Sequence, residues 1–198
     1  MMVKQIADCL LQEGVVLLPT DTVYGLAVSP QFPKAVDRLF ELKQRERHKN
    51  LPIMVADIPA MEQLGVAINA RARRLLESEY VPGALTVAIG FTTIPTVAWL
   101  EGREEVAIRI PDDEQLLAVL RATGPLLVTS ANASGYPVTP PLVADILPQL
   151  HGKPDLVVEG GSIKTIPSTL VNCRKDPPQI EREGAIPTAA IEAILDFV

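Results

Sequence analysis

Apolar residues recur along this chain with two different spacings, and the change from one to the other predicts its helices and strands. Spacings of three and four residues predict helices over residues 3–12, from about 33, over 59–64, 69–78 and 114–122, and from about 188. Short apolar runs predict strands at 15–18, 26–28, 51–56, 84–89, 105–110, 126–128, 155–158 and 168–172. Because these elements alternate without a strict βαβ rhythm, we expect an α/β fold with a twisted, mostly mixed sheet flanked by helices.

The stretch from residue 15 to residue 25 joins the most apolar of these strands to a polar turn. Four branched apolar residues, 15–18, run into Pro19 and then into Thr20, Asp21 and Thr22. A buried strand that delivers polar side chains at its carboxyl end is typical of ligand sites in open α/β sheets. The same residue types also end ordinary strands, so a purely structural turn is the alternative.

Three strand ends carry similar hydroxyl and amide groups, at residues 20–22, 129–132 and 168–169. If their strands share a sheet and run the same way, these groups converge on one crevice that can hydrogen-bond a small polar ligand. Three unrelated turns are the alternative interpretation.

Residues 43–49 form a cationic segment at the end of a predicted helix. The segment contains Lys43, Arg45, Arg47 and Lys49. Arginine offers a planar fork and lysine a point charge, which proteins combine to hold phosphates during phosphoryl or nucleotidyl transfer. The alternative is a solvated helix end whose charges complement the helix dipole.

Length and composition narrow the classes of protein. A chain of 198 residues favours one domain, 1–198, and its net charge of −6 argues against broad electrostatic wrapping of nucleic acid. No apolar run approaches the roughly 20 residues of a membrane-spanning helix, so we expect no membrane partner. The two cysteines, Cys9 and Cys173, lie far apart without a histidine pair nearby. We therefore expect neither disulfides nor a metal site, and a cytoplasmic location.

Several common catalytic patterns are missing. The chain has no glycine-rich loop with P-loop spacing and no dinucleotide-binding fingerprint. Ser130 lacks the flanking glycines of a nucleophile elbow, and the two histidines, His48 and His151, lie in polar surroundings. The hydroxyl groups of this chain are therefore expected to bind a ligand rather than attack it.

Six motifs occur in a specific order and spacing. They are Leu-Pro-Thr-Asp-Thr-Val-Tyr-Gly-Leu at 18–26, Lys-Gln-Arg at 43–45, Pro-Gly-Ala-Leu-Thr at 82–86, Val-Ala-Ile-Arg-Ile-Pro at 106–111, Ser-Ala-Asn at 130–132 and Pro-Ser-Thr at 167–169. Together they resemble the YrdC-like domain family, and the resemblance covers nearly the whole chain, to residues 182–186. The resemblance implies a YrdC-like α/β domain with an open cavity.

The same resemblance implies a nucleotidyltransferase, because the motifs look like those of the family's threonylcarbamoyl-adenylate synthases. Such enzymes make threonylcarbamoyl-AMP and pyrophosphate from L-threonine, bicarbonate and ATP, and Mg²⁺ is expected to arrive with ATP. A downstream tRNA-modifying complex then uses the product. The alternative is a noncatalytic member that binds RNA or the ribosome directly. A relative that uses carbamoyl phosphate has less support, since such domains normally sit inside longer chains.

The resemblance also assigns roles to individual residues. Lys43 and Arg45 are the expected catalytic pair. The expected nucleotide-binding residues are Lys43, Arg45, Lys49, Ser130, Asn132 and Arg182, and the expected threonine-binding residues are Thr20, Arg109 and Ser168. The chain departs from the family pattern at Glu46, Met54 and Val138. These departures leave open whether the activity is reduced or redirected.

Overall fold

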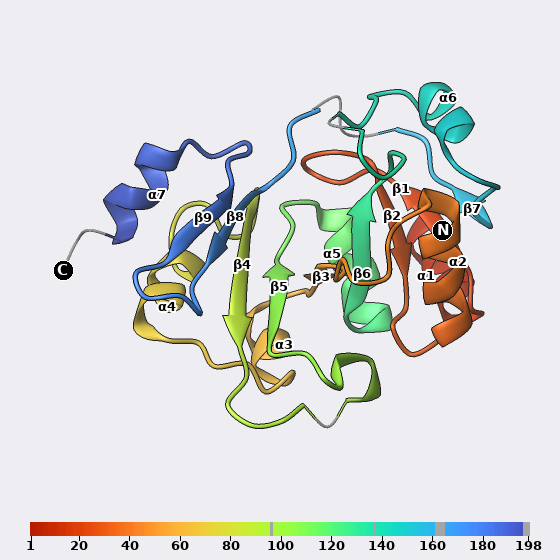
Figure 1. Ribbon diagram of the computed structural model, residues 1–198. Helices are drawn as coiled ribbons and strands as arrows, with labels where there is room; N and C mark the ends of the chain where they lie inside the picture. Colours follow the sequence, from red (N-terminus) through yellow and green to blue (C-terminus); the bar gives the residue numbers. More distant parts are fainter. Residues whose placement is uncertain (96, 137, 161–164, 196–198) are drawn as a thin grey trace.

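The computed structural model describes residues 1–95, 97–136, 138–160 and 165–195. Within them, one nine-stranded sheet runs through the molecule in the order β7-β1-β2-β6-β3-β5-β4-β8-β9 (Figure 1). The strands are β1 (Val16–Leu18), β2 (Gly25–Val28), β3 (Ile53–Met54), β4 (Leu85–Gly90), β5 (Glu105–Arg109), β6 (Leu126–Ser130), β7 (Leu156–Val157), β8 (Thr169–Asn172) and β9 (Gln179–Arg182).

Helices flank this sheet, as the apolar spacing predicts. They are α1 (Met2–Leu11), α2 (Pro33–Lys43), α3 (Ile58–Glu62), α4 (Ala70–Leu76), α5 (Glu114–Thr123), α6 (Val143–Ile146) and α7 (Thr188–Leu195), with 3-10 turns η1 (Ala98–Leu100) and η2 (Leu147–Gln149). In Figure 1, α1 and α2 lie beside β1 and β2, and α4 and α7 lie beside β8 and β9. No helix in the described part of the chain is long and apolar enough to cross a membrane.

The strand directions are mixed, which confirms the prediction of a mixed sheet. The pairs β1–β7, β3–β5 and β4–β8 are parallel, and the other neighbouring strands are antiparallel. Followed across the sheet, these pairings make β1, β6 and β8 run in the same direction. The three polar segments highlighted in the sequence therefore belong to strands that share both a sheet and a direction.

The two faces of the sheet pack against different helices. On one face, strand residues such as Leu26, Leu127 and Ile108 form a large core with α2, α4 and α7. On the other face, Val16 and Leu126 form a smaller core with α1 and α5. Successive side chains of a strand point to opposite faces, so β1, β2, β3 and β6 contribute to both cores. Strands β4, β5 and β8 contribute only to the larger core, and no helix among the described residues packs on their second face.

Several elements differ from the sequence prediction, which does not include helix α6 or the two 3-10 turns. Strand β3 has two residues where an apolar run of six predicts a longer strand, because Pro52 lacks the N–H that would extend the ladder on its amino side. Strand β9 is missed entirely, since it is a mostly exposed edge strand with one apolar residue, Ile180. An edge strand with a solvated side needs no apolar run. It is nevertheless the element that carries Arg182.

Candidate functional site

A cavity of about 310 Å³ lies on the second face of the sheet. Its lining contains every second residue of several strands, for example Thr86 and Ala88 of β4, and Ala107 and Arg109 of β5. Among the described residues, no helix contributes to the lining. Six of the sequence-predicted site residues line it, and they are Thr20, Arg45, Arg109, Ser130, Ser168 and Arg182.

The three polar strand ends meet in this cavity, but for a different reason from the one predicted. Thr20 follows β1 and Ser130 ends β6, so both lie at carboxyl ends, whereas Ser168 precedes the first residue of β8. Parallel strands place carboxyl ends at one edge, so edge geometry cannot bring Ser168 to the other two. The carboxyl-end argument therefore accounts for Thr20 and Ser130 but not for Ser168. The groups meet because the cavity extends across the sheet face.

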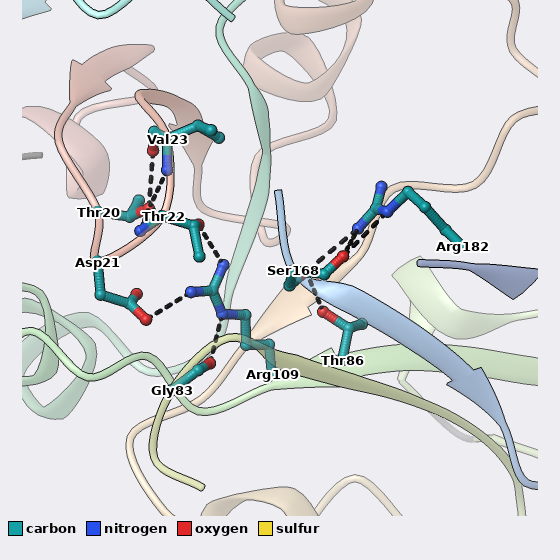
Figure 2. A network of polar contacts seen from close by, with 9 residues as sticks. All are labelled: Thr20, Asp21, Thr22, Val23, Gly83, Thr86, Arg109, Ser168 and Arg182. Carbon is teal, nitrogen blue, oxygen red and sulfur yellow. Dashed lines mark hydrogen bonds and ion pairs between the residues drawn. The ribbon is translucent and has the colours of Figure 1, made fainter. Parts of the chain in front are cut away.

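The turn after β1 is closed by the hydroxyl of Thr20, which is buried. Its Oγ1 donates to the carbonyl oxygen of Val23 at 2.7 Å and accepts from the backbone N–H groups of Thr22 at 3.1 Å and Val23 at 3.3 Å (Figure 2). Threonine hydroxyls often close turns in this way. The turn directs Asp21 and Thr22 toward Arg109. The predicted contact of Thr20 with threonine stays a prediction.

Arg109 is the most buried arginine of the cavity, with 5% of its surface exposed. Its Nε donates to the carbonyl of Gly83 at 2.8 Å, Nη1 to the hydroxyl of Thr22 at 2.7 Å and Nη2 to a carboxylate oxygen of Asp21 at 2.6 Å (Figure 2). Burial lowers the pKa of Arg109, and the negative charge of Asp21 opposes that shift. A guanidinium has five N–H groups. These three bonds leave one on each Nη atom for a ligand.

Ser168 lies at the centre of a second polar cluster, shown on the right of Figure 2. Its hydroxyl is 2.7 Å from the hydroxyl of Thr86 and accepts from Nη2 of Arg182 at 3.1 Å. The Nε and Nη2 atoms of Arg182 also donate to the Ser168 carbonyl, at 3.0 and 2.8 Å. Burial lowers the pKa of Arg182, and the positive charge of Arg109 lowers it further. The two arginines are thus close enough to repel each other.

Gly184 packs directly behind the Ser168 peptide. A Cβ atom at this position would overlap the carbonyl of Pro167 and the backbone of Ser168, and the N–H of Gly184 donates to the buried hydroxyl of Thr169 at 2.9 Å. A side chain here can be accommodated only if the 167–168 backbone moves into the cavity.

We therefore expect Gly184→Ala to displace Ser168 and to destabilise the protein by about 1–3 kcal/mol, the usual cost of overpacking. Urea unfolding and calorimetric binding of L-threonine would measure both effects. Gly65→Ala is the matched control, because a Cβ at Gly65 would meet open space and Gly65 does not line the cavity, although its positive φ of 74° adds some strain. Equal threonine affinity in Gly184→Ala and wild type would contradict the packing argument.

The cationic segment is positioned by the end of α2. The helix stops at Lys43 because Gln44 takes a left-handed conformation, with φ of 50°, and the chain then turns so that the N–H of Arg45 donates to the carbonyl of Phe40. Lys43 is 2% exposed, and its Nζ donates to the carbonyl of Ser130. Burial, helped by the charge of Arg45, lowers the pKa of Lys43 to about 7.

Arg45 faces the cavity from the same turn. Its Nε donates to the carbonyl of Lys49 and its Nη2 to the carbonyl of Asn50, each at 3.1 Å. Burial lowers the pKa of Arg45. The cationic segment is thus divided: Lys43 and Arg45 turn inward, whereas Arg47 lies over the ring of Phe40 and pairs with an exposed carboxylate.

Three predicted nucleotide-binding residues, Lys43, Lys49 and Asn132, lie outside the cavity lining, although Lys43 contacts the lining residue Ser130. The Asn132 amide donates to the carbonyl of Tyr136 at 2.7 Å and to that of Ala133 at 3.2 Å, while its oxygen accepts from Thr139 at 3.2 Å, so it organises its own loop. Lys49 pairs with Glu46 at 2.6 Å. Their roles in nucleotide binding stay predictions.

The three departures from the family pattern occupy different environments. Met54 lines the cavity, Val138 is exposed, and Glu46 is turned toward Lys49 and His48. The ammonium of Lys49 forms an ion pair with the carboxylate of Glu46 at the surface. Lys49 therefore balances the negative charge that the sequence places next to Arg45.

Several polar residues of the cavity were not predicted from the sequence, namely Thr86, Arg103, Glu105 and Glu181. Thr86 and Glu105 sit in apolar strands at the same alternate positions as Ala88 and Arg109. That alternation was the available signal, because a polar residue on a face that should be apolar needs a partner or a ligand. Arg103 and Glu181 gave no comparable signal, since both lie among charged neighbours.

The described residues contain no group of three or more histidine, cysteine or acidic side chains that could hold a metal ion. The two acidic lining residues, Glu105 and Glu181, both accept from the Asn172 amide, at 3.1 and 2.9 Å. The arginines are therefore the main cations that a ligand in this cavity would meet. A mixed sheet with such a cavity on its face defines a class of α/β protein suited to small anionic ligands.

Comparison with known proteins identifies the family of this chain. The Sua5/YciO/YrdC family model, described as "Telomere recombination", matches residues 8–184. The chain belongs to the Sua5/YciO/YrdC family. This finding confirms the resemblance to the YrdC-like domain.

Relatives of two kinds are found. The chain is 34% identical over 198 residues to the threonylcarbamoyl-AMP synthase of Bacillus subtilis (strain 168). This alignment covers 98% of this chain and 56% of that protein. It is 27% identical over 185 residues to the uncharacterized protein YciO of Escherichia coli (strain K12), covering 92% of this chain and 89% of that protein. The chain thus spans a little over half the length of the first of these relatives.

Solved structures show the same fold. The crystal structure of P. abyssi Sua5 complexed with L-threonine matches with a TM-score of 0.87 at 28% identity, covering 98% of this chain and 57% of that chain. The crystal structure of E. coli YciO matches with a TM-score of 0.84 at 25% identity, covering 96% of this chain and 92% of that chain. Both confirm the predicted α/β fold with a mixed sheet.

Proposed function

We propose that this protein is an L-threonylcarbamoyladenylate synthase, a nucleotidyltransferase that makes threonylcarbamoyl-AMP and pyrophosphate from L-threonine, bicarbonate and ATP. Its product would serve a downstream complex that modifies tRNA in the cytoplasm. The named synthases among the relatives support this activity, as does the Sua5 structure with L-threonine. The cavity volume of about 310 Å³ is within the usual range for small-molecule sites.

One observation carries the proposal: the cavity combines buried hydroxyl groups with cations that have no acidic partner. Among the described residues, Arg45, Arg103 and Arg182 form no ion pair, and each donates to backbone carbonyls instead. Uncompensated arginines in a partly buried cavity cost desolvation energy, which an anionic ligand can offset. ATP and the threonine carboxylate are such anions.

The chemistry needs positioning more than a covalent catalyst. The amine of threonine takes up carbon dioxide derived from bicarbonate, and a carbamate oxygen attacks the α-phosphorus of ATP as the bond to pyrophosphate breaks. The protein must hold two anions together and offset the charge that develops on the leaving group. Mg²⁺ bound with ATP would neutralise phosphate charge. The cavity carboxylates Glu105 and Glu181, which share the Asn172 amide, suit an ion that arrives with its nucleotide rather than a resident metal.

The two polar clusters suggest how the work is divided. The free N–H groups on the two Nη atoms of Arg109 suit the threonine carboxylate, with Ser168 and Thr20 nearby to orient the amino acid. Lys43 and Arg45 would act on the phosphates, joined by Arg182, which belongs to the second cluster through its bonds to Ser168. Ser130, Asn132 and Lys49 remain candidate nucleotide contacts.

We expect purified protein to release pyrophosphate only when ATP, Mg²⁺, L-threonine and bicarbonate are all present. The physical reason is that the nucleophile exists only once threonine has been carbamoylated. A coupled pyrophosphate assay with single omissions measures this, and mass spectrometry identifies the adenylate product. Equal pyrophosphate release without threonine would contradict the proposed substrate.

A noncatalytic RNA-binding role is the second candidate. It is kept as the alternative because E. coli YciO, a relative covered over 89% of its length, is named uncharacterized rather than as a synthase. RNA binding would weaken steeply with added salt because it releases counterions, whereas binding of ATP in a cavity would weaken less. The low aromatic content of 4% offers few stacking platforms for unpaired bases and favours the synthase.

A further inference from the structure

Arg103 lines the cavity. Neither the six sequence motifs nor the proposed mechanism assigns it a role. It lies between the 3-10 turn η1 and strand β5, where its N–H donates to the carbonyl of Leu100 at 3.1 Å. Gly102 precedes it with a φ of 74°, a left-handed conformation that glycine adopts without strain. This turn brings Arg103 into the lining of the same cavity as Arg45.

Among the described residues Arg103 has no acidic partner, although acidic residues follow it directly in the sequence. Glu104 and Glu105 both pair with Arg174 instead, at 2.5 and 3.8 Å. The side chain of Arg103 donates one long hydrogen bond, from Nη1 to the carbonyl of Leu51 at 3.4 Å. No ion pair within the described ranges therefore neutralises its positive charge.

Arg103 and Arg45 hold the same short backbone segment. Arg45 donates to the carbonyls of Lys49 and Asn50, and Arg103 donates to that of Leu51. Three consecutive carbonyls thus bind two guanidinium groups that both line the cavity. Burial lowers the pKa of both arginines. Two partly desolvated cations held only by neutral acceptors are poised for a ligand with several negative charges.

We propose that Arg103 is a binding residue for the polyphosphate of the nucleotide, and that it acts together with Arg45 on the part that leaves as pyrophosphate. This inference rests on the proposed function and adds a residue to its site. On binding, each arginine exchanges a bond to a neutral carbonyl for a charge-assisted bond to phosphate, which is shorter and stronger. The Leu51 carbonyl preorganises Arg103 until the nucleotide arrives.

The test measures binding of ATP, inorganic pyrophosphate and AMP to wild type and four variants by calorimetry. Arg103→Gln is expected to weaken binding of ATP and pyrophosphate by at least about tenfold, because one charge-assisted hydrogen bond is lost. AMP binding is expected to change by less than about threefold, since AMP lacks the leaving phosphates. Arg103→Lys keeps the charge but loses the fork, and an intermediate loss is expected.

The remaining variants calibrate the result. Arg45→Gln should weaken ATP binding at least as much as Arg103→Gln does, and Arg121→Gln, which alters an exposed arginine in the last turn of α5, should match wild type. Unchanged ATP and pyrophosphate affinity in Arg103→Gln, with a loss in Arg45→Gln, would overturn the inference alone. Equal losses for AMP and pyrophosphate would also overturn it. If wild type binds none of the three ligands, the proposed function itself fails.

Discussion

Replacing Asp21 with alanine is expected to lower the free energy of unfolding by about 3–5 kcal/mol, because it leaves the guanidinium of Arg109 buried without its counter-ion. The side chains of Asp21 and Arg109 are 9% and 5% exposed, and their charged atoms are 2.6 Å apart. Denaturation in urea, with the slope compared between variants, measures the loss. A pair at the surface contributes far less, typically below about 1 kcal/mol.

Two controls separate a buried charge from a lost contact. Asp37→Ala removes the acidic partner of Arg47 from a pair whose side chains are both more than half exposed, and we expect a loss below about 1 kcal/mol. The double variant Asp21→Ala with Arg109→Met should be more stable than the sum of its single effects predicts, because no uncompensated charge remains. Strict additivity would contradict the proposed coupling between Asp21 and Arg109.

The same ion pair has a consequence for ligand binding. Asp21 holds one Nη atom of Arg109 and Thr22 holds the other, so the guanidinium plane is fixed before a ligand arrives. The second oxygen of Asp21, Oδ1, is buried and has no hydrogen-bond partner within the described residues. A protein keeps such a costly arrangement where orientation matters. The turn after β1 therefore positions the arginine that we assign to the threonine carboxylate.

Much of the fold was predictable from the sequence, because the buried strands and amphipathic helices carry strong periodic patterns. Strands β5 and β6 and helix α5 are observed within two residues of their predicted bounds, and Asp113 caps α5 by accepting from the N–H of Leu116 at 2.8 Å. Strand β9 was not predictable, since pairing with β8 rather than an apolar pattern defines it. Tertiary pairing of this kind leaves no periodic signal.

The candidate site was predictable in its residue types but not in its geometry. The motifs identified Thr20, Arg109 and Ser168, and all three line one cavity. The edge argument failed for Ser168 because it assumed that polar groups gather where parallel strands end, whereas this residue lies before its strand. Arg103 was missed because its hydrogen bond to the Leu51 carbonyl, 52 residues away in the sequence, depends on how β5 lies beside β3. Sheet order can be established only from the structure.

Lys43→Met is expected to raise the free energy of unfolding at pH 6–7 by about 2 kcal/mol or more while abolishing the proposed activity. Burial lowers the pKa of Lys43 from its ordinary value of 10.5 to about 7, and each unit corresponds to about 1.4 kcal/mol. The buried ammonium therefore destabilises the folded state by at most about 5 kcal/mol. In Lys43→Met the Ser130 carbonyl loses its hydrogen-bond donor. This loss is expected to offset about 1–3 kcal/mol of the gain in unfolding free energy.

The pH dependence gives this prediction a distinctive sign. Below pH 7, Lys43 is protonated in both states and the folded protein carries the full cost of burial. As the pH rises from 7 toward 10.5, the folded state releases the proton while the unfolded state keeps it. The contribution of Lys43 to the free energy of unfolding of the wild type therefore increases across this range. The advantage of Lys43→Met over wild type should thus shrink across that window. Lys34→Met, an exposed position on the same helix, should show no such trend.

Activity is expected to change in the opposite direction. If Lys43 contacts the phosphates as a cation, its removal should cost about 2–5 kcal/mol of transition-state stabilisation, as for other desolvated charges. In wild type, kcat/KM for ATP should fall as the pH rises above 7, because the free protein loses the ammonium that binds phosphate. Unfolding curves and pyrophosphate release at pH 6, 7, 8 and 9 measure both properties on one set of samples. A Lys43→Met protein that is less stable than wild type at pH 6 would show that the ammonium is solvated, and Arg45 would remain as the only cation assigned from the Lys-Gln-Arg motif.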